Sequence, residues 1–208
     1  GDVSATLNVI KELVMEVKDP DEGQDNSNSL STMLLNSMQI YAPANETQGA
    51  TTLASNETVF SSLKKTDDFQ GFTKEQNKEI LKEIQKYCSP RIEEAEESLQ
   101  KIYKSSYLTT QNHEALFAIL KEIPQYAGSS TWRAYDSFIS LLESGLITET
   151  NQKQIFTILK EIPLYAGGGI YQALQSFISL LETLKQKQIT LTENDLAVII
   201  NMIKTQGD

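Results

Sequence analysis

The chain has 208 residues, of which 39% are apolar, so it is long enough for one extended domain or for a repeat domain preceded by a smaller segment. Its formal net charge of −10 argues against nucleic acid and anionic membranes as main partners, because binding to phosphates needs clustered Lys and Arg, and it favours a partner protein with a basic patch. No window approaches the roughly 18 apolar residues of a membrane span, which predicts no membrane insertion, and the single cysteine, Cys88, excludes an intrachain disulfide.

Residues 1–68 are predicted to form two helices followed by a long connection. Apolar residues recur at helical spacing in residues 4–17, and a second helix is expected at residues 30–41. Residues 43–56 are rich in Thr, Ala, Asn and Gly, which is typical of a mobile connection, and a short helix is expected at residues 58–65. The first two helices either cap the exposed end of a repeat stack or form a separate arm, and we favour the cap because such stacks need polar ends.

The rest of the chain is dominated by a repeat. Residues 119–128, Ile-Leu-Lys-Glu-Ile-Pro-Gln-Tyr-Ala-Gly, return almost unchanged at residues 158–167. Residues 116–143 and 155–182 align without a gap and are identical at 18 of 28 positions, and a more diverged copy lies 39 residues before the first. Repeats of this length indicate stacked helical hairpins, whose usual role is to present a surface.

The repeat predicts an all-α fold, a right-handed stack of antiparallel helical hairpins with an N-terminal helical cap. The two closely similar units have apolar residues at positions i, i+3, i+4 and i+7 in two segments, which is the pattern of two amphipathic helices. Pro124 and Pro163 are expected to end the first helix, because the ring removes an N–H and clashes with the preceding turn. The predicted boundaries are residues 1–68 for the cap, 69–107, 108–146 and 147–188 for three units of about 39 residues, and 189–208 for a closing helix.

Positions at which the copies differ are candidates for a binding surface, because core positions tend to stay fixed after duplication whereas surface positions can diverge toward a target. At the start of the second helix, one copy has Trp132, Arg133 and Tyr135, and the next has Tyr171 at the position of Trp132. Trp, Tyr and Arg are enriched at interface hot spots, so these four residues are predicted to contact a partner. The alternative is that Trp132 and Tyr171 close the gap between hairpins, since large aromatic side chains are mostly buried.

Catalytic and metal-binding residue patterns are sparse. His113 is the only histidine, so a metal site built on several imidazoles cannot be assembled, and no cofactor is expected. Cys88 and His113 form a nucleophile and base only if the fold brings them together. Cys88 aligns with Ala127 and Ala166 of the other copies, which favours a small-residue packing position for the thiol.

Two further features keep an enzyme or a small-ligand site as an alternative. An acidic run contains Glu93, Glu94, Glu96 and Glu97, and paired carboxylates can hydrolyse glycosides, although a solvated helical face is the commoner role of such a run. The Gly167–Gly169 turn could offer backbone amides to a phosphate, but it lacks the Lys-Ser/Thr ending and the preceding strand of a phosphate-binding loop. We therefore expect no enzyme.

Residues 171–181, Tyr-Gln-Ala-Leu-Gln-Ser-Phe-Ile-Ser-Leu-Leu, follow a glycine and resemble the second helix of a tetratricopeptide hairpin. The likeness covers only that half of each unit, because the first helix lacks the family's Trp and Leu-Gly signature. The unit is also longer than the family's usual ~34 residues and is nearer in length to HEAT and armadillo repeats. The resemblance implies an α-solenoid that binds other proteins.

The composition is rich in Gln, Asn, Lys and Ile, and in this respect the chain is similar to secreted effectors of intracellular bacteria and to the small proteins that regulate them. That resemblance implies action inside a host cell; otherwise we expect a soluble, cytoplasmic protein. The sequence favours a noncatalytic protein–protein interaction module. The other hypotheses are an enzyme or ligand pocket, and a scaffold within a longer chain.

Overall fold

The computed structural model describes residues 2–17, 27–39, 71–104 and 113–206, and within these ranges it contains helices and turns but no strand. The predicted all-α class is therefore confirmed. The connection expected at 43–56 and the short helix expected at 58–65 lie outside the described residues. Among the described helices, none combines the length and the apolar character that crossing a membrane requires.

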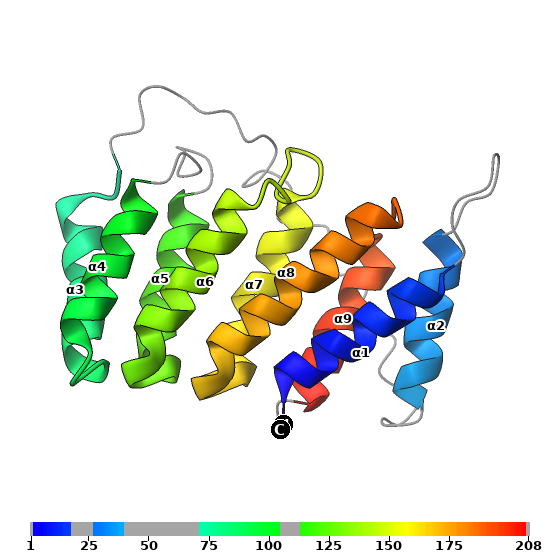
Figure 1. The fold of residues 1–208 in the computed structure, drawn as a ribbon, viewed down its shortest axis with the longest axis horizontal. Coiled ribbons are helices and arrows are strands. Elements are labelled where there is room, and N and C mark those ends of the chain that lie inside the picture. The colour runs from blue at the N-terminus through cyan, green and yellow to red at the C-terminus, as the bar shows by residue number, and fades with distance from the viewer. Residues whose placement is uncertain (1, 18–26, 40–70, 105–112, 207–208) are drawn as a thin grey trace.

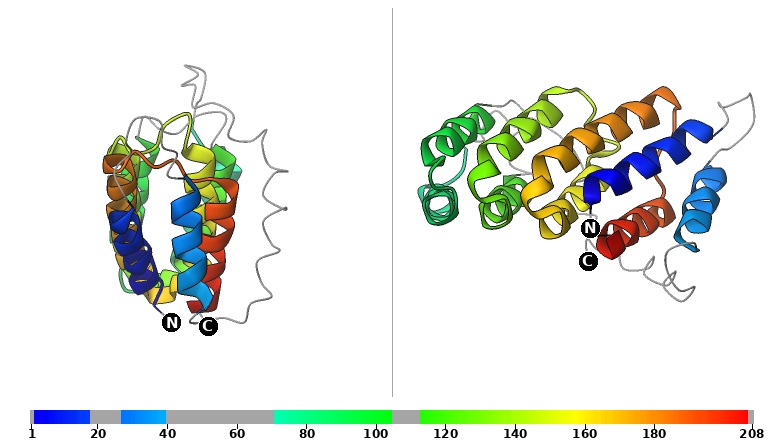
Figure 2. Two further views of the ribbon diagram at one scale, coloured as in Figure 1. Left: turned by 90° about the vertical axis from the view of Figure 1, so that its right-hand side faces the viewer. Right: turned by 60° about the horizontal axis from the view of Figure 1, so that its bottom comes forward.

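The helices lie in two rows that run side by side (Figures 1 and 2). In chain order they are α1 (Val3–Glu16), α2 (Ser27–Gln39), α3 (Lys74–Tyr87), α4 (Ile92–Tyr103), α5 (His113–Ala127), α6 (Thr131–Glu143), α7 (Gln152–Ala166), α8 (Ile170–Gln186) and α9 (Glu193–Gln206). The first row has the order α3, α5, α7, α9 and α2, and the second row has the order α4, α6, α8 and α1, as the contacts between neighbouring helices show.

The two N-terminal helices lie at the end of the rows that is farthest from α3 and α4 (Figure 1). Helix α1 packs against α8 and α9, and its contact with α8 is the most extensive between any two described helices. Polar contacts between described residues add to this packing: the Ser4 hydroxyl oxygen is 2.6 Å from that of Ser176 and 3.5 Å from the Gln172 carbonyl, and Lys187 Nζ donates to the Val17 carbonyl at 3.0 Å. The beginning of the chain is thus packed against the last hairpin of the repeat.

The core lies between the two rows. Its largest side chains that are fully buried include Phe138 and Phe177, which occupy equivalent positions in α6 and α8. Burial of each such side chain stabilises the fold by about 1.5–3 kcal/mol. Ala95, Ala134 and Ala173 are also fully buried and recur at the same position of α4, α6 and α8.

Three helices of the first row begin differently from α4, α6 and α8 of the second row, whereas α1 of the second row is capped by the Asp2 side chain. In the first row, a Thr side chain accepts from the backbone N–H three residues later, and the side chain of that residue accepts from the Thr N–H in return, which is the capping-box arrangement. The pairs are Thr73 with Gln76 before α3, Thr148 with Asn151 before α7 and Thr192 with Asp195 before α9. In the second row, α4, α6 and α8 begin without a side-chain cap.

The expectation that prolines end the first helix of each unit is wrong. Helix α5 continues through Pro124 to Ala127, and α7 continues through Pro163 to Ala166. Pro124 cannot donate to the carbonyl of Leu120, four residues earlier, but the Tyr135 hydroxyl donates to that oxygen at 2.7 Å instead. The first helices end at Gly128 and Gly167, whose φ angles of +58° and +55° favour glycine.

Candidate functional site

Three of the four predicted contact residues meet on the surface of the second row. Trp132 and Arg133 lie in the first turn of α6, and Tyr171 lies in the first turn of the neighbouring helix α8. The Arg133 guanidinium carbon is 5.1 Å from the centroid of the Trp132 ring and 5.4 Å from that of the Tyr171 ring. Both distances fall within the range of cation–π interactions, each worth about 0.5–1 kcal/mol at an exposed site.

This aromatic–arginine cluster, Trp132 with Arg133 and Tyr171, is open to solvent. The Arg133 side chain is exposed, and both rings are partly exposed. The Gln172 side-chain amide donates to the Tyr171 hydroxyl at 2.8 Å and holds the outer edge of that ring. The contacts among Trp132, Arg133 and Tyr171 therefore hold these side chains together on the surface without a bound partner.

Tyr135 does not belong to this surface, contrary to the prediction. Its side chain is fully buried, and its hydroxyl donates to the Leu120 carbonyl within the core. Burial is also the main cause that raises the pKa of the Tyr135 phenol well above its ordinary value. A partner could reach Tyr135 only if the hairpin opened, so we leave this residue out of the site.

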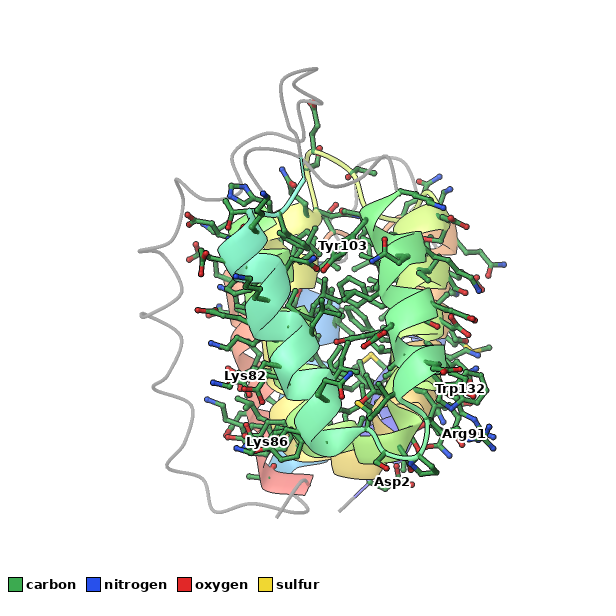
Figure 3. All side chains as sticks on the ribbon, turned by 90° about the vertical axis from the view of Figure 1, so that its left-hand side faces the viewer. Asp2, Lys82, Lys86, Arg91, Tyr103 and Trp132 are labelled. Carbon is green, nitrogen blue, oxygen red and sulfur yellow. The ribbon has the colours of Figure 1, made fainter. Side chains whose placement is uncertain are left out.

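Arg91 is a residue that the sequence analysis missed. The chain has only two arginines, Arg91 and Arg133, and they lie at the N-terminal ends of the adjacent helices α4 and α6. Arg91 and Trp132 appear at the same corner of the second row in Figure 3. The rarity of arginine in a chain that otherwise uses lysine was the signal that could have drawn attention to this end of the helices.

The acidic run lies on α4, and two of its side chains contact other residues of the chain. Glu93 and Glu97 are exposed, Glu94 is 3.5 Å from the Arg91 guanidinium, and Glu96 accepts from the Gln85 side chain at 3.1 Å. Glu93 and Glu94 also lie in the first turn of α4, where negative charge is favoured by the helix dipole. Glu93 and Glu97 thus belong to a solvated helical face, whereas Glu94 and Glu96 are partly buried, and the Oε2 atom of Glu94 is buried without a hydrogen-bond partner.

The Gly167–Gly169 turn forms a single turn of 3₁₀-helix between α7 and α8. The equivalent residues of the preceding hairpin, Gly128–Ser130, form the same short helix with a different sequence. A Cβ added at Gly168 would have no neighbour within 4 Å among the described residues, so that side of the turn is open space. The geometry is that of an interhelical turn.

Cys88 and His113 lie near opposite ends of the helices. A Cβ added at Gly128 would lie 3.7 Å from the Tyr87 carbonyl oxygen, which places Cys88 beside the C-terminal end of α5. His113 is the first residue of α5, about 20 Å away along that helix. Cys88 is fully buried, and burial raises the pKa of its thiol, which disfavours the thiolate that a nucleophile needs.

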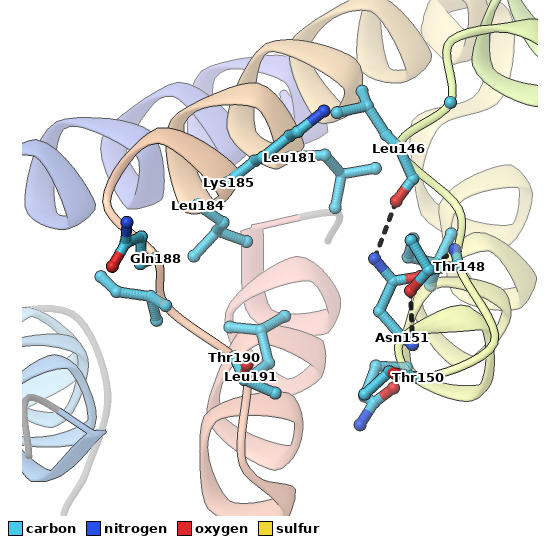
Figure 4. Close-up of a pocket in the computed structure, with 14 residues that line it drawn as sticks. Leu146, Thr148, Thr150, Asn151, Leu181, Leu184, Lys185, Gln188, Thr190 and Leu191 are labelled. Carbon is cyan, nitrogen blue, oxygen red and sulfur yellow. Dashed lines mark hydrogen bonds between the residues drawn. The ribbon is translucent and has the colours of Figure 1, made fainter.

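A pocket of about 410 Å³ lies at the end of α8 that is farthest from the aromatic–arginine cluster (Figure 4). The loop between α6 and α7, the start of α7 and the residues that follow α8 surround it. Its wall is mainly aliphatic and includes Leu146, Ile155, Leu181 and Leu184, with Lys185 as its charged residue. Neither the acidic run nor the Gly167–Gly169 turn contributes to this pocket.

No group of three or more His, Cys, Asp or Glu side chains suited to a metal ion is present among the residues that the structure describes. Comparisons of the chain with models of protein families, with curated proteins and with solved structures find no match. A functional assignment therefore depends on the residues of this chain and on their geometry.

Proposed function

We propose that the chain is a noncatalytic protein–protein interaction module, built as a right-handed stack of three antiparallel helical hairpins that α9 closes. The spacing of the helices supports this architecture. Helix α5 begins 39 residues after α3, and α7 begins 39 residues after α5. The same spacing separates α4 from α6 and α6 from α8. Each helix also packs against its equivalent in the next hairpin, as expected for repeated units stacked by translation.

The N-terminal helices complete this architecture as a cap. Helix α1 packs beside both α8 and α9, and it occupies the place next to α8 in the second row. Helix α2 then covers the outer side of α9. The cap satisfies the need of a repeat stack to cover the apolar face of its last unit.

The aromatic–arginine cluster is the observation on which the proposed function depends. Interface hot spots are enriched in Trp, Tyr and Arg, and such residues bind best where the free protein already holds them in place. Gap-filling aromatic side chains would be buried as Tyr135 is, whereas Trp132 and Tyr171 remain partly exposed and flank an exposed cation. A contact surface accounts for this arrangement better than packing alone.

The partner in this proposal is another protein. The net charge of −10 favours a partner whose surrounding surface is basic. We further propose that the protein is a bacterial effector, or a regulator of one, that acts in the cytoplasm or inside a host cell. The composition supports this assignment, and partners unrelated to infection would contradict it.

Affinity capture with matched variants tests the proposed surface. The variant W132A/R133Q/Y171A removes the aromatic–arginine cluster, and K78Q/K82Q changes two exposed residues of α3 in the other row. Each immobilised chain is incubated with bacterial and host-cell lysates, and the retained proteins are quantified by mass spectrometry.

We expect a small set of proteins to be retained by the unmodified chain and by K78Q/K82Q but lost from the cluster variant. Equal retention by all three chains contradicts the assignment of this surface. Circular dichroism and thermal unfolding verify that the variants keep the fold.

The pocket at the end of α8 favours a second function, the binding of a small ligand. Its mainly aliphatic wall and its single charged residue, Lys185, suit an amphiphilic molecule with an anionic group. Native mass spectrometry of the protein purified from cells tests this function. A bound mass that disappears when Leu184 is replaced by Glu favours the second function, and a protein free of added mass favours the first.

A further inference from the structure

We propose that the aromatic–arginine cluster recognises a carboxylate side chain, Asp or Glu, in a short segment of the partner protein. The inference rests on the proposed function and adds the chemistry of the group that is bound. Arg133 would pair with the carboxylate, while Trp132 and Tyr171 would contact the apolar part of the same segment.

The donors of the Arg133 guanidinium are available for a ligand. Its described contacts are with the faces of the Trp132 and Tyr171 rings, and no described carboxylate lies within ion-pair distance of it. Stacking against rings uses the face of the planar guanidinium and leaves its N–H groups at the edge. Two parallel N–H donors at such an edge match the two oxygens of a carboxylate.

The charges around Arg133 also favour an anion. The first turns of α6 and α8 contain no acidic residue, and neither helix has a side-chain cap. The helices on either side do carry acids at this end, with Glu93 and Glu94 in α4 and Asp2 as the N-cap of α1. The starts of α6 and α8 therefore lack the acidic residues that α4 and α1 carry at the same end of the row. Their helix dipoles add to the attraction of Arg133 for an anion.

Arg91 shows what happens where an acid of the chain is within reach. Its guanidinium is 3.5 Å from Glu94, three residues later in the same helix. At the position of Arg133 in α6, the residue three positions later is Asp136, but the Asp136 carboxylate accepts from the Ser98 hydroxyl of α4 at 2.7 Å. The nearest acid in the sequence is thus engaged elsewhere, and the ligand supplies the missing carboxylate.

The overall charge limits what the partner segment can be. A chain with a net charge of −10 repels an extended acidic partner, so long runs of Asp and Glu are disfavoured. A single carboxylate among basic or apolar residues avoids this repulsion. Such a segment also agrees with the basic surroundings proposed for the partner.

Selection of short random peptides displayed on phage tests the inference without a known partner. The immobilised 208-residue chain is the target, and enriched peptides are synthesised for affinity measurements by fluorescence anisotropy. Each acidic residue of a peptide is replaced by its amide, Asp by Asn and Glu by Gln. Every peptide is measured against the unmodified chain, R133K, R133Q, W132A/Y171A and the control K82Q.

We expect the enriched peptides to share one Asp or Glu. Its replacement by the amide should weaken binding to the unmodified chain and to K82Q about tenfold or more, and should change binding to R133Q little. R133K keeps the charge but loses the planar pair of donors, so it should recover only part of the affinity.

The inference is overturned if no peptide is enriched, if the peptides lack an acid, or if the amide weakens binding to the unmodified chain and to R133Q equally. If the enriched peptides lack an acid but lose their binding in W132A/Y171A, the cluster is still a protein-binding surface, and only the recognition of a carboxylate is contradicted. Peptides that bind all variants equally would reject both.

Discussion

The α5–α6 and α7–α8 hairpins have most of their sequence in common, and they differ at three kinds of position. Both have a first helix of 15 residues with a proline inside it, and both then form a short 3₁₀ turn. Their second helices differ in length, because α6 ends near Gly145, whose φ is +76°, whereas the equivalent residue of α8 is Leu184 and the helix continues to Gln186. The residues that the two hairpins share therefore give the same turn between their helices, and Gly145 accounts for the earlier end of α6.

The other differences divide between interior and surface. In the interior, Tyr135 of α6 donates to the Leu120 carbonyl, whereas its equivalent in α8, Leu174, has no donor. On the surface, Arg133 is replaced by Gln172 one hairpin later. The two hairpins therefore diverge in two ways: one substitution adds a hydrogen bond in the core, from Tyr135 to the Leu120 carbonyl, and another changes a surface residue, from Arg133 to Gln172. The following experiments separate them.

The largest effect is expected at a position where the hairpins are alike. Phe138→Ala and Phe177→Ala each remove a fully buried ring, and each should destabilise the protein by about 3–5 kcal/mol. Chemical denaturation monitored by circular dichroism measures both. A difference of more than about 2 kcal/mol between the two would show that the hairpins are not equivalent in their packing.

The next effect concerns the interior difference. Tyr135→Phe leaves the Leu120 carbonyl without its donor and should cost about 1–3 kcal/mol. In a Pro124→Ala background the new N–H can bond to that carbonyl, so the same substitution should cost about 1 kcal/mol less. The double-mutant cycle is measured by urea denaturation, and additive effects would mean that the hydroxyl does not replace the proline's missing N–H.

A comparable or smaller effect is expected at the glycines of the second turn. Gly167→Ala places a side chain at a φ of +55° and a ψ of −128°, a conformation nearly restricted to glycine, and should cost about 1–3 kcal/mol. Gly168→Ala has open space around the new Cβ and no positive φ, so it should be neutral or should stabilise the protein by up to about 1 kcal/mol. Thermal unfolding compares the two, and an equal loss in both would contradict the assigned turn geometry.

The smallest effect on stability is expected on the surface. Arg133→Gln makes the α5–α6 hairpin resemble the α7–α8 hairpin at this position, and it should change the free energy of unfolding by no more than about 1 kcal/mol. The same variant should lose affinity for the partner. A large loss of stability would instead indicate that the aromatic–arginine cluster holds the hairpins together and is not a contact surface.

The sequence alone was sufficient for the helical class and for the starts of α6 and α8, because the 39-residue recurrence and the apolar spacing can be seen directly in it. It failed at Pro124 and Pro163. The helices continue through both prolines, and at Pro124 the donor that replaces the missing N–H comes from the following helix, where no local pattern reveals it. Tertiary contacts thus overrode a strong local preference.

The candidate site was predicted in part. The proximity of Trp132, Arg133 and Tyr171 followed from their places at the starts of equivalent helices. The burial of Tyr135 did not follow, because a tyrosine at a variable position fits a surface and a core equally well until its hydroxyl has a known partner. The pocket at the end of α8 also could not be foreseen, since it forms where residues from two loops and two helices meet.

Site-specific photo-crosslinking tests the central claim, that a partner protein binds at the starts of α6 and α8. A photoreactive residue is placed at Gln175, which is exposed one turn after Tyr171, or at Gln186, which is exposed at the far end of the same helix. We expect crosslinked protein from cell lysate mainly at position 175, and we expect it to disappear in the W132A/R133Q/Y171A background. Equal crosslinking at both positions, or crosslinking at 175 that the triple substitution leaves unchanged, would contradict the account.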